Sequence, residues 1–73
     1  MFVVKWVVRH QDENPVEVED SVLTNLDEIV ASCKERLYGV RLRFTTHPPD
    51  GFIVCDENGK ELRRWFGPVA PHV

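Results

Sequence analysis

The chain has 73 residues, of which 42% are hydrophobic and 29% charged, and its formal net charge at pH 7 is −3. This length and composition are typical of one small globular domain and exclude a disordered chain, although such a domain buries only about 60% of its unfolded surface. The negative net charge argues against strong unspecific binding to nucleic acid or to anionic membranes. We expect a single domain over residues 1–67 and a short tail over residues 68–73.

The first two predicted elements are strands. Residues 2–9 alternate between two faces and are rich in valine and aromatic residues, a pattern that predicts a strand. A polar turn over residues 10–15 leads to a shorter alternating segment, residues 16–19, which we expect to pair back antiparallel. The core side of these two strands should then carry Phe2, Val4, Trp6, Val8, Val16 and Val18.

A helix is predicted from residue 26 onward. Asn25 can cap its N-terminus, and Glu28 three residues later can return a hydrogen bond to the cap. The residues Leu26, Ile29, Val30, Cys33 and Leu37 follow helical spacing and form one apolar stripe. Gly39 is the expected left-handed residue that ends the helix.

The segment after Gly39 predicts a third strand over residues 40–45. Its alternation would place Val40, Leu42 and Phe44 toward the core, with Arg41 and Arg43 on the outer face. Two adjacent prolines in residues 46–51 exclude regular pairing there, so that this stretch is a connector.

A β-hairpin is predicted over residues 52–66, with its turn at Asp56-Glu57-Asn58-Gly59. A two-residue turn would pair Cys55 with Leu62, whereas a type I turn followed by a bulge at Gly59 would pair Val54 with Leu62. We favour the bulged turn. It groups Phe52, Val54, Leu62 and Phe66 on the core side and leaves Ile53, Arg63 and Trp65 on the outer face.

The predicted order ββαβββ indicates an α+β fold, in which one antiparallel sheet is covered by one helix on one face. A strand pair, a capped helix, a further strand and an acidic-glycine turn that leads to Arg63-Arg64-Trp65-Phe66-Gly67 together resemble short uncharacterised bacterial domains of ββαββ type. Those families have no established activity, so the resemblance implies a fold and no chemistry.

No catalytic or cofactor-binding motif is present. The glycines are single residues at turns, and the three histidines have no Cys or His partner at metal-ligand spacing. Cys33 and Cys55 are expected to be reduced packing residues, and a Cys55–His47 nucleophile pair would require a pocket that so small a domain rarely encloses. We expect no enzyme activity, metal, cofactor or small-molecule ligand. The apolar N-terminal run is interrupted by Lys5 and is too short to span a membrane, so we expect a cytoplasmic protein without a signal peptide.

Charge is distributed unevenly along the chain. Seven acidic residues and no basic residue lie between Asp12 and Glu28, and most of the basic residues follow. The two groups can neutralise each other within the fold, which is the interpretation we favour, or they can form a self-complementary dimer surface.

The outer face of the predicted sheet is the candidate binding surface. It would combine apolar residues with arginines and a tryptophan, residue types that are enriched in protein interfaces. One alternative is an ordinary solvated face, with Trp65 partly covered by the tail over residues 68–73. Another is a weak nucleic-acid platform, but a small local excess of positive charge supports little phosphate-driven affinity. We therefore expect a non-enzymatic protein-interaction domain, most simply a homodimer, with Arg41, Arg43, Arg63 and Trp65 as contact residues.

Overall fold

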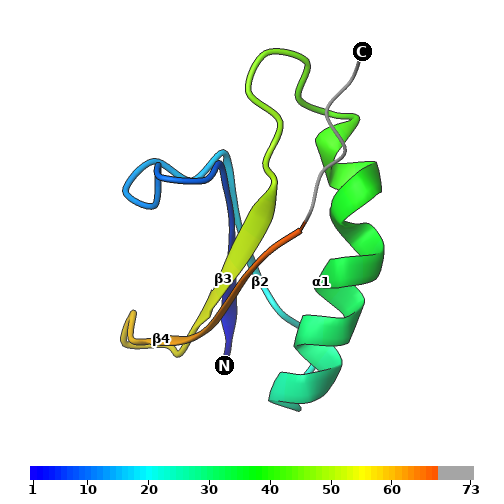
Figure 1. Cartoon of the computed structure of the whole chain (residues 1–73). Coiled ribbons are helices and arrows are strands. Elements are labelled where there is room, and N and C mark those ends of the chain that lie inside the picture. Colours follow the sequence, from blue (N-terminus) through cyan, green and yellow to red (C-terminus); the bar gives the residue numbers. More distant parts are fainter. Residues whose placement is uncertain (68–73) are drawn as a thin grey trace.

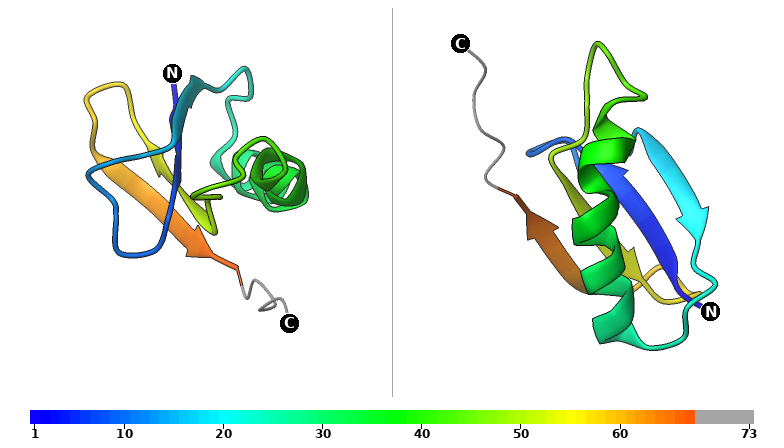
Figure 2. Two further views of the ribbon diagram at one scale, coloured as in Figure 1. Left: turned by 90° about the horizontal axis from the view of Figure 1, so that it is seen from above. Right: turned by 90° about the vertical axis from the view of Figure 1, so that its right-hand side faces the viewer.

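The computed structural model describes residues 1–67, and the predicted tail, 68–73, lies outside the described residues. Its elements are β1 (Val3–Val7), β2 (Glu17–Asp20), α1 (Leu26–Arg41), β3 (Gly51–Cys55) and β4 (Glu61–Phe66). The four strands form one antiparallel sheet in the order β2-β1-β3-β4. The helix covers one face of this sheet (Figures 1 and 2). This confirms the predicted α+β class with a single antiparallel sheet and one helix.

The main core lies between α1 and the two central strands. Val4 and Trp6 of β1 and Phe52 and Val54 of β3 point toward the helix and are fully buried. The rings of Trp6 and Phe52 meet edge to face, with centroids 5.7 Å apart. The helix contributes the buried residues Ile29, Cys33, Leu37 and Val40. Most of the predicted apolar stripe is therefore confirmed.

The helix begins as predicted but ends later. The Asn25 side chain accepts a hydrogen bond of 3.1 Å from the Glu28 amide, which caps the first turn. The helix continues through Gly39, which is exposed and has no positive φ, and ends at Arg41. The prediction that Gly39 ends the helix is wrong because Val40 continues the apolar stripe one turn beyond Leu37 and is buried by doing so.

No strand forms over residues 40–45, so the predicted third strand is wrong and the sheet has four strands. Val40 and Arg41 belong to α1, and residues 42–50 form an irregular connection to β3. Leu42, which was expected in the core, is 67% exposed. Arg41 donates a hydrogen bond of 2.8 Å from its guanidinium to the carbonyl of the buried Pro49, which fixes the connection against the end of the helix.

The β3–β4 hairpin has the predicted turn, but its register differs from both of the registers considered from the sequence. Gly59 has a φ of 87°, as the turn requires, and the Asp56 carboxylate accepts hydrogen bonds from the amides of residues 58 and 60. Val54 pairs with Arg63 and Cys55 with Glu61, so the irregularity falls at Leu62. A one-residue shift exchanges the faces of a strand. Phe66 therefore points away from the helix, which corrects its predicted place in the core.

The short edge strand β2 also has its faces exchanged relative to the prediction. Val18 was expected in the core but is 53% exposed, and it lies opposite Lys5 of β1. Glu17 and Glu19 lie opposite Trp6 and Val4, whose side chains face α1. Glu19 faces α1 because the Trp6 indole and Arg36 of α1 donate hydrogen bonds to it there. Glu17 has its partner in Arg43, just after the helix.

A second, smaller apolar cluster lies on the face of the sheet opposite α1. Val7, Ile53 and Cys55 are buried there, and Phe66 packs against them. Ile53 was expected on the outer face of the sheet and does lie there, but it is buried and not exposed. Within residues 1–67, the single helix is too short and too polar to cross a bilayer.

Candidate protein-binding edge

The structure separates the four predicted contact residues into two pairs. Arg63 and Trp65 are on β4, at one edge of the sheet. Arg41 is the last residue of α1, and Arg43 follows it in the connection to β3. The Arg43 side chain forms a 3.1 Å ion pair with Glu17 of β2, at the opposite edge. The four residues therefore do not form one surface, and only Arg63 and Trp65 lie at the β4 edge.

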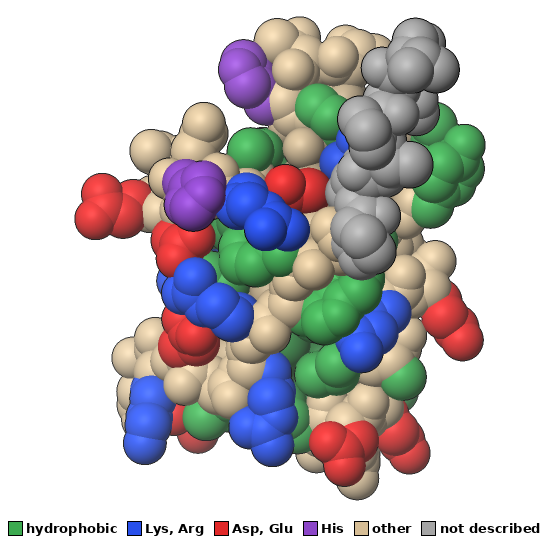
Figure 3. All heavy atoms as spheres, in the orientation of Figure 1, with side chains coloured by type: hydrophobic (Ala, Val, Ile, Leu, Met, Phe, Trp, Pro, Cys, Tyr) green, Lys and Arg blue, Asp and Glu red, His purple; other side chains and the backbone are tan. Residues whose placement is uncertain are grey.

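Trp65 faces the helix and not the outer face, which corrects the prediction. It lies directly opposite Phe52, and the two ring centroids are 5.7 Å apart. The amino group of Lys34 on α1 lies 5.1 Å from the centre of the indole, a cation–π distance. Trp65 is only half-buried, because β4 is the last strand of the sheet and the helix is packed mainly over β1 and β3. Figure 3 shows hydrophobic side chains between β4 and α1, with basic side chains around them.

The outer edge of β4 presents main-chain hydrogen-bonding groups. The Gly67 amide donates a 3.0 Å hydrogen bond to the Asp50 carbonyl, toward the β3 side. Residues along an antiparallel strand alternate between bonding one neighbour and the other, so Trp65 and Arg63 also bond toward β3. The N–H and C=O groups of Arg64 and Phe66 point away from the sheet. Among residues 1–67 no strand pairs with this edge.

The cations beside this edge differ in whether a carboxylate neutralises them. Arg64 forms 2.7 Å ion pairs with Asp12 and Glu61. These hydrogen bonds raise the pKa of Arg64 and lower that of Glu61. Lys34 and Arg63 are exposed and form no ion pair with any carboxylate of residues 1–67. The helix side of the β4 edge thus carries two cations whose charge is not neutralised by the described part of the chain.

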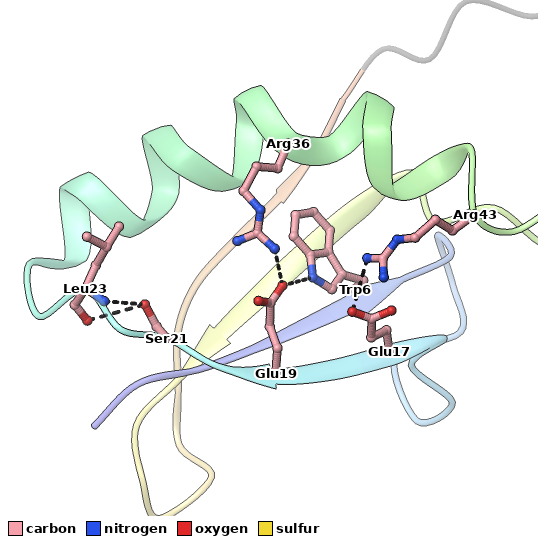
Figure 4. Close-up of polar contacts among 7 residues, drawn as sticks. All are labelled: Trp6, Glu17, Glu19, Ser21, Leu23, Arg36 and Arg43. Carbon is pink, nitrogen blue, oxygen red and sulfur yellow. Dashed lines mark hydrogen bonds and ion pairs between the residues drawn. The ribbon is translucent and has the colours of Figure 1, made fainter.

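The other edge of the sheet is closed by side-chain contacts (Figure 4). Oε1 of Glu19 accepts hydrogen bonds of 2.6 Å from both the Trp6 indole and the Arg36 guanidinium. Glu17 accepts one from Arg43. These bonds attach β2 to α1 and to the connection after it. Inward-facing charged residues and a short length are features that protect an edge strand from pairing with another chain, so β2 is a poor docking edge and β4 is the better one.

The acidic and basic groups of the sequence meet within the fold. Asp12 pairs with Arg64, Glu17 with Arg43, and Glu19 with Arg36. The favoured interpretation of the uneven charge is therefore confirmed. It also removes support from the nucleic-acid alternative, because four arginines have carboxylate partners and the indole does not face outward.

A shallow pocket of about 600 Å³ lies on the face of the sheet opposite α1. Phe66 and Arg64 of β4 line one side, and residues 9–14 line the other. The Arg9 guanidinium lies 5.3 Å from the centre of the Phe66 ring and pairs with Asp50. Both arginines that line this pocket are already paired with carboxylates, and the Phe66 ring is the aromatic part of its lining.

Both cysteines are buried, and the described structure keeps Cys55 apart from His47. Cys33 is buried in the main core, and burial raises the pKa of its thiol to about 11. Cys55 is buried at the end of β3, whereas His47 is exposed in the connection that precedes the start of that strand (Figure 1). The Cys55–His47 pair considered from the sequence is thus not assembled. In the part of the chain that the structure describes, no group of three or more potential ligands is placed to hold a metal ion.

No protein-family model matches the chain, and neither does any curated protein or solved structure. The resemblance to bacterial ββαββ domains stays a prediction. The role of the β4 edge therefore depends on its geometry. The sequence pointed to Arg63 and Trp65 as contact residues but not to Lys34, whose place over the Trp65 ring depends on the packing of α1 against β4.

Proposed function

We propose that this chain is a small non-enzymatic protein-interaction domain that binds an extended segment of a protein along β4. The proposal is carried by the outward-facing N–H and C=O groups of Arg64 and Phe66, at an edge with no strand partner among residues 1–67. Strand addition to a free edge is a common mode of peptide recognition, in which main-chain hydrogen bonds supply affinity and alternate side chains supply specificity.

The side chains at this edge suit such a role. Trp65 is half-buried, and it is held by Phe52 beside it on β3 and by Lys34 over its ring. A tryptophan that is already fixed by packing loses little conformational freedom when a partner covers it. Tryptophan and arginine are also the residue types that most often dominate interface energies.

A homodimer, the simplest partner expected from the sequence, would be the self-binding form of this proposal. Two-fold pairing of β4 with β4 of a second copy brings Arg63 and Arg64 near the same residues of that copy. Like charges that lie opposite each other on paired strands are destabilising. The charges on β4 therefore favour a partner other than a second copy of β4.

Site-specific photocrosslinking in cells tests the proposal. A photoreactive phenylalanine analogue replaces Arg63 on β4 in one variant and Val18 on β2 in a matched control, both being exposed positions on edge strands. We expect discrete covalent protein adducts from position 63 and none from position 18. Adducts of equal yield from both positions, or none from position 63, would contradict the proposal. Sedimentation of the purified chain at high concentration shows whether a second copy is the partner.

A further inference from the structure

Resting on the proposed function, we infer that the segment bound by β4 is an acidic, extended stretch of a different protein. Its acidic side chains would lie on the α1 side of the sheet and alternate with apolar side chains on the opposite side.

The requirement for acidic residues comes from the α1 side of the edge. Successive side chains of a strand alternate between the two faces of a sheet. Arg63 and Trp65 point to the α1 side, and Lys34 of α1 lies over the Trp65 ring. Every second residue of a strand added about 4.8 Å from β4 would thus lie beside these groups. Since neither Lys34 nor Arg63 has a carboxylate partner in residues 1–67, a carboxylate of the guest strand would neutralise them.

The requirement for apolar residues comes from the opposite side. Phe66 points there and packs against the cluster of Val7, Ile53 and Cys55. Arg64 also points there, but Asp12 and Glu61 already neutralise it. A guest carboxylate would gain little beside Arg64, whereas a valine or isoleucine would cover the accessible part of the Phe66 ring.

The chain's own acidic segment is a poor candidate for this guest. Its carboxylates at positions 12, 17 and 19 are engaged by arginines of the same molecule. Addition of β2 of one copy to β4 of the next would also be head-to-tail, and such pairing leads to open-ended assemblies. The guest is therefore assigned to a separate protein.

Three labelled peptides test the inference by fluorescence anisotropy. In each peptide valine alternates with one other residue, which is glutamate in the first, threonine in the second and lysine in the third. All three have the same length. We expect the glutamate–valine peptide to bind, and its affinity to fall as salt rises from 0.1 M to 1 M, because screening shortens from about 10 Å to about 3 Å. The lysine–valine peptide should not bind. Two further glutamate–valine peptides carry N-methyl groups on every second amide, one at the odd and one at the even positions. One should lose binding and the other should retain it, because an added strand bonds β4 through every second residue only.

A charge exchange gives the sharpest control. Lys34→Glu with Arg63→Glu changes two exposed residues and leaves the core unchanged. This double variant should bind the glutamate–valine peptide about tenfold more weakly and should gain binding to the lysine–valine peptide. Lys5→Glu with Lys60→Glu, which makes the same change in net charge but keeps Lys34 and Arg63, should retain most of the original affinity.

Amide hydrogen exchange of Arg64 and Phe66 distinguishes failure of this inference from failure of the proposed function. If the threonine or the lysine peptide slows exchange of these amides as much as the glutamate peptide does, the preference for acidic residues would be overturned. Strand addition to β4 would still be supported. Binding of the glutamate peptide without protection of these amides would overturn both. Absence of binding by all three peptides would overturn the acidic-strand inference, while crosslinking from position 63 would still decide the proposed function.

Discussion

Phe52 and Trp65 lie directly opposite each other on β3 and β4, and their ring centroids are 5.7 Å apart. This pairing determines which face every residue of β4 presents. It places Trp65 and Arg63 beside α1 and turns Arg64 and Phe66 to the opposite face. It also places Arg63 on the same side of the sheet as Lys34, and Arg64 and Phe66 beside the pocket on the opposite face.

Trp65→Ala should lower the free energy of unfolding by about 2–3 kcal/mol, less than a fully buried tryptophan would cost because this ring is half-exposed. Chemical denaturation measures the change. The control Trp65→Phe keeps a ring against Phe52 and should cost clearly less. A fully stable alanine variant would show that Trp65 does not pack against the helix side of the sheet.

Two glycine-to-alanine substitutions should change the stability of the fold in opposite directions. Gly39→Ala should stabilise the fold by about 0.5–1 kcal/mol, because the residue is within α1 and an added Cβ would meet nothing within 4 Å. Gly59→Ala should destabilise it by about 1–2 kcal/mol, because the φ of 87° is unfavourable for alanine. Thermal or denaturant unfolding of the two variants checks both signs. Destabilisation by Gly39→Ala would mean that the helix ends at this residue.

Glu19→Ala should lower stability by about 1–3 kcal/mol, because it leaves the buried Trp6 indole N–H without its acceptor. Glu19→Gln retains an acceptor oxygen and loses mainly the partly exposed ion pair with Arg36, which is worth about 0.2–1 kcal/mol. Denaturation of the two variants in parallel separates the contributions. Equal losses would indicate that the ion pair, and not the indole hydrogen bond, stabilises this edge.

Cys33 should make stability fall at high pH. Burial raises the pKa of its thiol from 9.0 to about 11, so the folded state retains a proton that the unfolded state has lost between these values. The thiol contributes no pH dependence below about pH 9, and stability should fall as pH rises from about 9 to 11. Cys33→Ala should flatten this part of the stability–pH curve. Native-state alkylation at pH 8 should also be slower at Cys33 than in a free-cysteine peptide.

Much of the local structure was determined by the sequence alone. Alternation predicted β1, the Asn25 cap and the apolar stripe predicted the helix, and the Asp56–Gly59 signature predicted the turn, because each depends on neighbours within a few residues. The α+β class followed, since one helical stripe needs one sheet face. Residues 40–44 were ambiguous because their valine, leucine and phenylalanine suit either a strand or a continued helix.

Only the tertiary structure decided the faces of the edge strands. A one-residue difference in register reverses a strand, and at β4 the irregularity at Leu62 turned Trp65 toward α1. At β2, hydrogen bonds from Trp6 and Arg36 turned Glu19 inward, and one from Arg43 did the same for Glu17. Val18 was left exposed. These choices depend on partners far away in the sequence, and so does the meeting of Lys34 with Trp65, for which no local pattern exists.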